Sequence, residues 1–588
     1  MPDSPAAIAS TYFPGARCEN ERWIRSEMLG LLDHWFDWRK SLFPEDLAAT
    51  PEAAAAPVAR AELSARLDEL AQALTAETPT HTPRYIGHMK AEISLPALFG
   101  WLAAMLHNPN NTSHEASRVG SVIETEAVAL LASMLGYDPT EAQGHFTSGG
   151  TVANFEAVWR ARYRMDHWLS LGLYVAETTG EPLDVFAAAH MGWDRFRELW
   201  DRHGLTDATL RRHSAAVGNP AAVWARIGRA AGGDYLGPVL LAPGTKHYSW
   251  LKAANVFGLG EGSLWSVALD AEGRLDVEDL DRLIREARAQ GRPVLMAVSV
   301  AGTTETSEID PIDAVHDRLE AWERDAGVHI WRHVDAAYGG FLCSIPGGPD
   351  EAALSPASAA ALRAVRRADS VTIDPHKLGY VPYACGAFLT RDRARYAVSA
   401  FDAPYLDRPE LGDGKWASTL EGSRSAAGAA ATWLTGRTLG FGPGGLGALL
   451  AETVRTARAF RGAIAAAVPE VRFLEPVDAN IVCFSLARDG ESLSSSNART
   501  AALFDAIHAS AELSASRTTL GAGYARLIDR HLAGYGGRKD AEGLVLVRCV
   551  FMNPYWADPA NRQLLFPQIA DFIRRQAEAT APAMRGAA

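Results

Sequence analysis

The sequence predicts an α/β fold, in which helices cover both faces of a mostly parallel sheet, followed by a small C-terminal α+β domain. Two observations support this fold class. Between residues 238 and 373, short and largely apolar runs alternate with amphipathic helical patterns, as expected for strands that are buried on both faces. After about residue 440, a glycine-rich junction at 442–447 leads into mixed strand and helix patterns, which indicates a second, smaller unit.

The individual elements follow from hydrophobic periodicity and from turn residues. Near the N-terminus, Trp and Leu at helical spacing predict helices over 24–43 and 61–74, separated by an Ala- and Pro-rich linker at 48–57. In the central part, strands are expected at 238–241, 264–269, 293–300, 328–334 and 370–373, and helices at 155–163, 246–257, 277–289 and 311–324. In the C-terminal part, helices are expected at 449–466, 498–513 and 562–577, and strands at 471–474, 481–486 and 544–551. We therefore expect an N-terminal helical segment (1–80), a large domain (81–440) and a small domain (441–588).

Composition narrows the class of protein. Of the 588 residues, 48% are apolar and 22% charged, which excludes a wholly disordered chain. With 57 basic and 70 acidic residues, the net charge of −13 argues against a nucleic-acid partner. The five cysteines lie far apart and form no CxxC pair, so we expect neither a metal site nor a disulfide framework. We also expect no signal peptide and no membrane span, and therefore a cytoplasmic protein.

A lysine just past a predicted strand is the sharpest chemical signal. In the run VTIDPHK (371–377), Lys377 follows His376, and Gly379 allows a close backbone approach. A lysine amine in such a position can form an imine with an aldehyde cofactor if its surroundings lower its pKa. The plain alternative is a loop lysine in a surface ion pair.

An aspartate ends the preceding strand, in the run HVDAAYGG (333–340). Asp335 can pair with a protonated pyridine nitrogen and so keep a heteroaromatic ring in its electron-accepting form. The small side chains of Ala336 and Ala337 leave room for a flat ring. An isolated aspartate at a turn is also a common helix cap.

Three further strand ends carry suitable side chains. The run TSGGTVAN (147–154) precedes a helical pattern, and the free N–H groups at such a helix start bind phosphate. His247, in TKHYSWLK (245–252), can stack on a flat ring, and the hydroxyls of VAGTTETS (300–307) can orient ring substituents. Each of the three has an ordinary structural explanation when it stands alone. Together, the five segments supply the parts that hold pyridoxal 5′-phosphate (PLP).

These runs resemble the PLP-dependent group II amino-acid decarboxylases. The resemblance rests on TSGGTVAN, TKHYSWLKAA, GTTE, HVDAAYGG and TIDPHK, with supporting stretches at 85–89, 107–111, 374–383 and 420–424. It extends from about residue 80 to 555 and is greatest to the bacterial L-tyrosine decarboxylases. It implies a type I aminotransferase fold with a seven-stranded, mostly parallel sheet, a homodimer, and conversion of an aromatic L-amino acid, tyrosine first, to its amine and carbon dioxide.

The resemblance also implies roles for individual residues. Lys377 would form the imine with the cofactor, Asp335 would pair with the pyridine nitrogen, and His247 and Ala337 would contact the two faces of the ring. The remaining roles concern the phosphate (Gly150, Thr151 and His376), the ring oxygen or substrate carboxylate (Thr304), the substrate side (His88) and the return of a proton to the α carbon (Tyr405).

Several alternatives stay open at this point. Aspartate or glutamate could be the substrate, and Arg84 or Arg424 could then bind the side-chain carboxylate. The same cofactor could support transamination or oxidative deamination, or the protein could bind the cofactor without turnover. The run GLGEG (258–262) hints at a nicotinamide oxidoreductase, but it lacks the third glycine of that motif at the required spacing.

Overall fold

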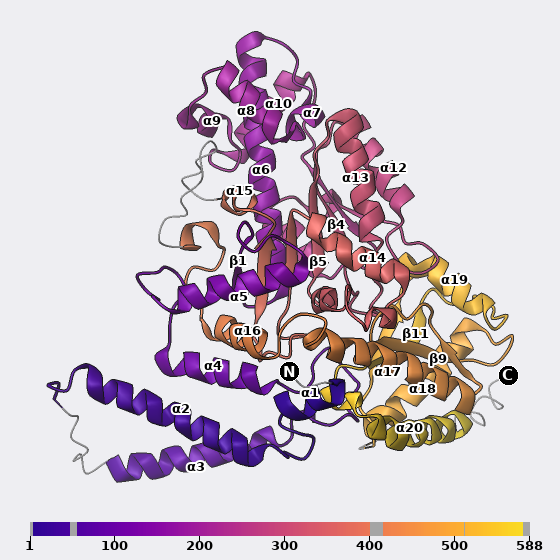
Figure 1. Ribbon diagram of the computed structural model, residues 1–588. Helices are drawn as coiled ribbons and strands as arrows, with labels where there is room; N and C mark the ends of the chain where they lie inside the picture. The colour runs from indigo at the N-terminus through magenta and orange to yellow at the C-terminus, as the bar shows by residue number, and fades with distance from the viewer. Residues whose placement is uncertain (1–3, 48–55, 400–414, 511, 580–588) are drawn as a thin grey trace.

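The computed structural model describes residues 4–47, 56–399, 415–510 and 512–579 (Figure 1). A seven-stranded sheet forms its centre, with the strand order β1-β7-β6-β5-β4-β2-β3. Six strands run in one direction, and β7 runs antiparallel to both of its neighbours, β1 and β6. The strands are β1 (Gln143–Thr147), β2 (Val239–Pro243), β3 (Leu264–Val267), β4 (Val294–Val300), β5 (Trp331–Ala336), β6 (Ser370–Ile373) and β7 (Gly386–Thr390). The expected seven-stranded, mostly parallel sheet is confirmed.

Helices cover both faces of this sheet, as the apolar strands predicted. In β2, Leu240 and Ala242 pack into the same cluster as the long helix α6 (Gly150–Thr179). The alternate residues Val239 and Leu241 pack with α12 (Val277–Ala289) and α13 (Ile312–Ala326) on the other face. Since successive side chains of a strand point to opposite faces, the sheet is buried on both sides.

Further helices complete the large unit. They are α4 (Leu95–His107), α5 (Gly120–Leu135), α11 (Ser249–Val256), α14 (Pro356–Ala364), α15 (Arg393–Ala397) and α16 (Ala427–Thr438). A lobe at the far end of α6 contains α7 (Val185–Ala189), α8 (Gly192–Arg202), α9 (Asp207–His213) and α10 (Pro220–Ala231) (Figure 1). Within it, α8 and α9 pack with α6 in a small apolar cluster that includes Trp168, Phe196 and Trp200, whereas α7 and α10 pack with residues of the central sheet.

The C-terminal part forms a four-stranded antiparallel sheet with the order β10-β11-β9-β8. Its strands are β8 (Val471–Phe473), β9 (Ile481–Leu486), β10 (Ser516–Leu520) and β11 (Leu544–Val550), and its helices are α17 (Leu446–Ala467), α18 (Leu493–Ala509), α19 (Ala525–Ala533) and α20 (Pro559–Ala579). Ile86, from the start of the large unit, packs into this core and exchanges backbone hydrogen bonds of 2.8 Å with Ser514 and Val550. Backbone hydrogen bonds and apolar packing therefore join the two units next to residues 85–88.

Three helices precede the large unit: α1 (Pro5–Tyr12), α2 (Glu21–Leu42) and α3 (Ala56–Leu74). The expected linker at 48–57 lies mostly outside the described residues. Helix α2 buries no residue, and α2 and α3 project as an arm (Figure 1). No helix in the described part of the chain is long and apolar enough to cross a membrane.

Two local features of the structure bear on the expected functional residues. The helix expected at 246–257 begins only at Ser249, which leaves His247 in a loop at the end of β2. The GLGEG run connects α11 to β3, and its glycines Gly258 and Gly260 have positive φ angles of 68° and 79°. A helix-to-strand turn cannot serve as the strand-to-helix turn of a dinucleotide site, so the nicotinamide hypothesis fails.

Candidate active site

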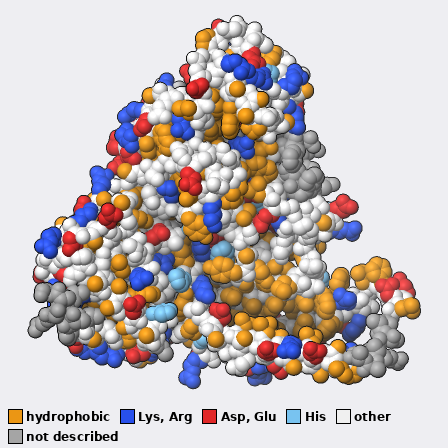
Figure 2. All heavy atoms as spheres, turned by 180° about the vertical axis from the view of Figure 1, so that it is seen from behind, with side chains coloured by type: hydrophobic (Ala, Val, Ile, Leu, Met, Phe, Trp, Pro, Cys, Tyr) orange, Lys and Arg blue, Asp and Glu red, His pale blue; other side chains and the backbone are white. Residues whose placement is uncertain are grey.

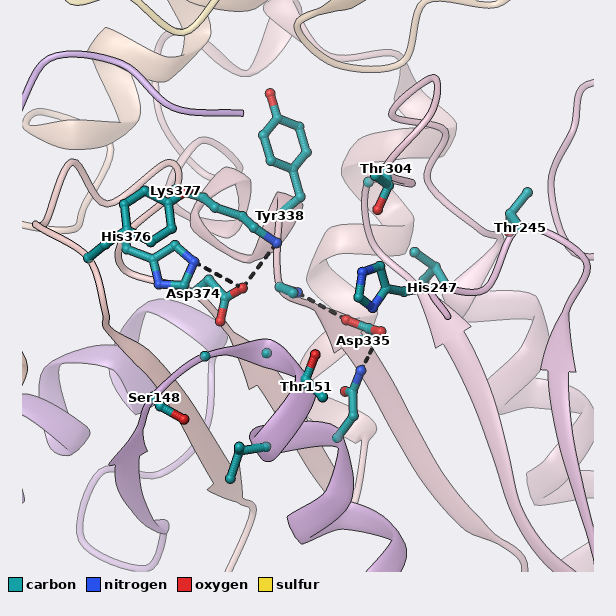
Figure 3. Close-up of a pocket in the computed structure, with 18 residues that line it drawn as sticks. Ser148, Thr151, Thr245, His247, Thr304, Asp335, Tyr338, Asp374, His376 and Lys377 are labelled. Atoms are coloured by element: carbon teal, nitrogen blue, oxygen red, sulfur yellow. Dashed lines mark hydrogen bonds and ion pairs between the residues drawn. The ribbon is translucent and has the colours of Figure 1, made fainter. Parts of the chain in front are cut away.

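A cavity of about 370 Å³ lies at the carboxyl ends of the central parallel strands, beside the N-terminus of α6 (Figure 3). This is the edge at which parallel sheets bind ligands. Eight predicted site residues line it: Gly150, Thr151, His247, Thr304, Asp335, Ala337, His376 and Lys377. His88 is absent from the lining, and Tyr405 lies outside the described residues.

Lys377 reaches the cavity from the loop that follows β6. Its Nζ lies 3.0 Å from the carboxylate of Asp374, three residues earlier (Figure 3). The backbone N–H of Lys377 also donates to the Asp374 carbonyl oxygen, which closes a tight turn. The other carboxylate oxygen of Asp374, Oδ1, is buried and has no hydrogen-bond partner among the described residues. The turn thus holds a lysine amine at the cavity beside a carboxylate with spare hydrogen-bonding capacity.

Asp335, at the end of β5, is held by three N–H groups. Its Oδ2 accepts hydrogen bonds from Asn154 Nδ2 at 2.8 Å and from Trp250 Nε1 at 3.0 Å, and its Oδ1 accepts one from the Ala337 backbone at 3.3 Å. The aspartate therefore does not act as a helix cap. It presents a buried carboxylate to the cavity from the floor formed by β5.

Two imidazoles flank these groups. Burial lowers the pKa of both His247 and His376, so both rings are predominantly neutral at pH 7. In each ring, Nδ1 accepts a backbone N–H, from Ser249 at 3.3 Å and from Cys385 at 3.1 Å. His376 also lies against Tyr383, with ring centroids 4.1 Å apart. Both rings are thereby fixed in orientation and can contact a flat or anionic ligand.

The N-terminus of α6 forms the opposite wall. Its N-cap residue is Gly149, and no side chain caps the helix there. A Cβ atom at Gly150 would lie 2.9 Å from Asp374 Oδ2 and 3.1 Å from the Ala337 Cβ, so only glycine fits without a shift. Uncapped N–H groups and the positive end of the helix dipole favour an anion at this wall.

His88 does not line the cavity. It is exposed, and its backbone N–H donates to the Tyr85 hydroxyl at 3.1 Å. Partial desolvation lowers the pKa of His88, and the Arg548 guanidinium lowers it further. Arg548 donates to the backbone oxygens of Gly87 and Thr304, at 3.1 and 2.7 Å, so it connects the His88 segment with the Thr304 loop.

Sequence reasoning missed further residues of this site, and three of them contact its charged groups. Asp374 stands in the same heptapeptide as Lys377, and Asn154 and Trp250 stand in the quoted runs TSGGTVAN and TKHYSWLK. Asn154 lies one helical turn after Gly150, and this i, i+4 spacing could have placed it on the cavity face of α6. Nothing in the sequence pairs Trp250 with Asp335.

The residues present fit PLP. The cavity brings together a lysine amine, a buried carboxylate, a neutral imidazole and an uncapped helix start, which match an aldehyde, a pyridinium nitrogen, a flat ring and a phosphate. A side chain at Gly150 would crowd Asp374 and Ala337 at the uncapped helix start.

Comparison with known proteins agrees with this chemistry. Residues 235–487 match the pyridoxal-dependent decarboxylase conserved domain. An L-tyrosine decarboxylase of Enterococcus faecium is 31% identical over 484 residues, 76% of each chain, and one of Levilactobacillus brevis is 31% identical over 526 residues, 81% of this chain and 80% of that one. A crystal structure of mouse CSAD superposes with a TM-score of 0.62 at 18% identity, over 95% of this chain and 98% of the other. The chain belongs to the pyridoxal-dependent decarboxylase family, and its cofactor is pyridoxal 5′-phosphate.

Proposed function

We propose that this amino-acid decarboxylase acts on an aromatic L-amino acid and converts L-tyrosine to tyramine and carbon dioxide. The observation that carries the proposal is the 31% identity to the E. faecium L-tyrosine decarboxylase over three quarters of both chains. The proposal makes two claims, that the substrate is aromatic and that it is tyrosine, and one experiment can test them separately.

The charge of the cavity supports an aromatic over an acidic substrate. A side-chain carboxylate needs a cationic partner, and none of the described residues that line the cavity is an arginine. Arg424 is buried and bound to Glu124 and to two backbone oxygens. Arg84 donates to Gln568 and to the Glu512 backbone. Neither arginine considered for an acidic substrate lines the cavity.

We assign the cofactor contacts to residues that line the cavity. When bound, PLP supplies an electron sink for the bond between the α carbon and the carboxylate. Lys377 holds the aldehyde end, Asp335 keeps the proton on the ring nitrogen, and His247 and Ala337 contact the ring faces. Gly150, Thr151 and His376 would bind the phosphate, and Thr304 would contact the ring oxygen or the substrate carboxylate.

Proton transfer to the product requires an acid near the α carbon. We propose Tyr405 for this role, in line with the resemblance seen in the sequence, and His88 for the substrate side. A positioned acid of this kind contributes about 10²–10⁴-fold to the rate.

We further propose that the protein is a homodimer that buries the N-terminal arm. Large apolar side chains are exposed along α2 and α3, among them Phe36, Trp38, Leu63, Leu67 and Leu70. Figure 2 shows hydrophobic side chains gathered along this arm and over the adjoining body. Large exposed apolar patches mark association surfaces. Sedimentation of the holoenzyme tests this, and a monomer at micromolar concentration would refute it.

Product analysis tests the substrate. Purified, PLP-loaded protein is incubated in parallel with tyrosine, DOPA, phenylalanine, tryptophan, aspartate and glutamate, and carbon dioxide and amine are both measured. We expect tyramine and carbon dioxide in equal amounts from tyrosine. Decarboxylation of aspartate or glutamate alone would overturn the aromatic proposal, and an aldehyde or keto acid in place of the amine would overturn the assigned outcome of the reaction.

A further inference from the structure

The carboxylate of Asp335 is bonded unevenly. Its Oδ2 receives two short N–H bonds from the side chains of Asn154 and Trp250, whereas its Oδ1 receives one longer bond from the Ala337 backbone. A carboxylate oxygen accepts about two hydrogen bonds. Oδ2 is therefore saturated, and Oδ1 keeps capacity for one more donor.

The two donors come from separate elements and are themselves fixed. Asn154 belongs to α6 and Trp250 to α11, and both are almost completely buried. The Asn154 amide also donates to the Ser249 hydroxyl at 3.0 Å and accepts from His333 Nε2 at 3.4 Å, a contact that sets which end of the amide faces Asp335.

The His333 contact is anchored in turn. Its Nδ1 lies 2.8 Å from the Ser370 hydroxyl, and burial lowers the pKa of His333 to about 4, so the ring is neutral and carries one N–H; we assign this N–H to Nε2, which faces the Asn154 carbonyl oxygen. The indole of Trp250 packs edge-on against the same ring, with centroids 5.3 Å apart. The donors to Asp335 thus form one packed unit that resists rotation of the carboxylate.

We propose that Trp250 and Asn154 are positioning residues, which hold Asp335 so that its unsaturated oxygen faces the cofactor ring nitrogen. Neither residue needs to touch the substrate. Loss of either N–H bond would free the carboxylate to rotate and would weaken its interaction with the ring. The inference rests on the proposed role of Asp335.

The test uses Trp250→Phe and Asn154→Ala in the PLP-loaded enzyme. A hydrogen bond to a charged group corresponds to a factor of about 10–100 in an equilibrium constant, so we expect PLP to dissociate at least about tenfold more readily from either variant. We also expect the pH midpoint of the bound cofactor's visible absorbance to shift, and kcat to fall with little change in KM.

Trp322→Phe is the matched control. Trp322, on α13, also donates its indole N–H to a carboxylate, Asp281 Oδ1 at 2.9 Å, but it does not line the cavity. We expect this variant to lose stability but to keep the PLP dissociation constant and the absorbance midpoint. Equal effects in Trp250→Phe and Trp322→Phe would mean that Trp250 acts through overall stability alone, which overturns the proposal.

Asp335→Asn distinguishes the proposed role of Asp335 from the positioning roles of Trp250 and Asn154. If Asp335→Asn leaves PLP affinity and absorbance unchanged, the proposed role of Asp335 fails. If Asp335→Asn changes both but Trp250→Phe and Asn154→Ala change neither, the role of Asp335 stands and the positioning proposal is wrong. Should Trp250→Phe not fold, Asn154→Ala alone decides between these outcomes.

Discussion

Arg160→Met is expected to destabilise the folded protein by about 3–5 kcal/mol, the cost of breaking a buried ion pair on one side. Arg160 is fully buried on α6 and donates hydrogen bonds to the Glu156 carboxylate and to the backbone oxygens of Tyr396 and Ser418. Its guanidinium also lies 4.7 Å from the ring centroid of Phe388. One side chain therefore ties α6 to two segments that are distant in sequence.

Most of the expected destabilisation comes from the Glu156 carboxylate, which would stay buried without its cationic partner. Burial alone would raise the pKa of Glu156, but His145 and Arg160 outweigh it and hold the pKa below its ordinary value of 4.5. A carboxyl group whose pKa is lowered by folding stabilises the protein above about pH 4.5, and this contribution is lost as the pH falls. The deficit of Arg160→Met relative to the parent protein should therefore be largest near pH 7 and shrink below about pH 4.5.

Urea unfolding of the holoenzyme at constant PLP concentration measures this effect, because bound cofactor itself adds stability. Glu156→Gln and the double variant complete a cycle, and we expect the double variant to be less destabilised than the sum of the single changes. Arg195→Met, which removes an exposed partner of Glu198, is the control and should cost less than about 1 kcal/mol. A loss below about 1 kcal/mol for Arg160→Met, or strict additivity in the cycle, would refute the reasoning.

Three further predictions concern the cofactor and the proposed acid. Lys377→Ala is expected to abolish turnover and the visible absorbance of the bound cofactor; retained turnover in purified, PLP-loaded protein would contradict the assignment. Tyr405→Phe should slow amine formation by about 10²–10⁴-fold, measured as the rate of tyramine release at saturating tyrosine, and normal amine formation would remove Tyr405 from the mechanism. Gly150→Ala should weaken PLP binding, at a cost of about 1–3 kcal/mol, because the new Cβ would lie 2.9 Å from Asp374. Gly462→Ala, on α17 with open space around it, should leave PLP binding unchanged.

The sequence predicted those features that depend on one continuous stretch of residues. Apolar runs predicted β4, β5 and β6, and residues at or just beyond their carboxyl ends, such as Asp335 and Lys377, do line one cavity. The strands β1, β7 and β10 were not predicted, because five-residue segments flanked by glycine or polar residues carry little periodicity.

Hydrogen bonds and ion pairs between side chains far apart in the sequence could not be predicted from it. The bond from Trp250 to Asp335 spans 85 positions, and that from Asn154 spans 181. Such contacts depend on how α6 and α11 cross the sheet, which local patterns do not specify. The converse holds for Arg424. The sequence suggested it as a contact for an acidic substrate, but it forms a buried ion pair with Glu124.

The length of α6 has a practical consequence for experiments on this protein. Its 30 residues extend over about 45 Å, with the cavity at one end and the lobe of α7–α10 at the other. Because α8 and α9 of that lobe pack in an apolar cluster of their own, a fluorescent label or an affinity tag on their surface would sit far from the cavity. The lobe therefore offers a place to attach reporters or to immobilise the enzyme without disturbing turnover.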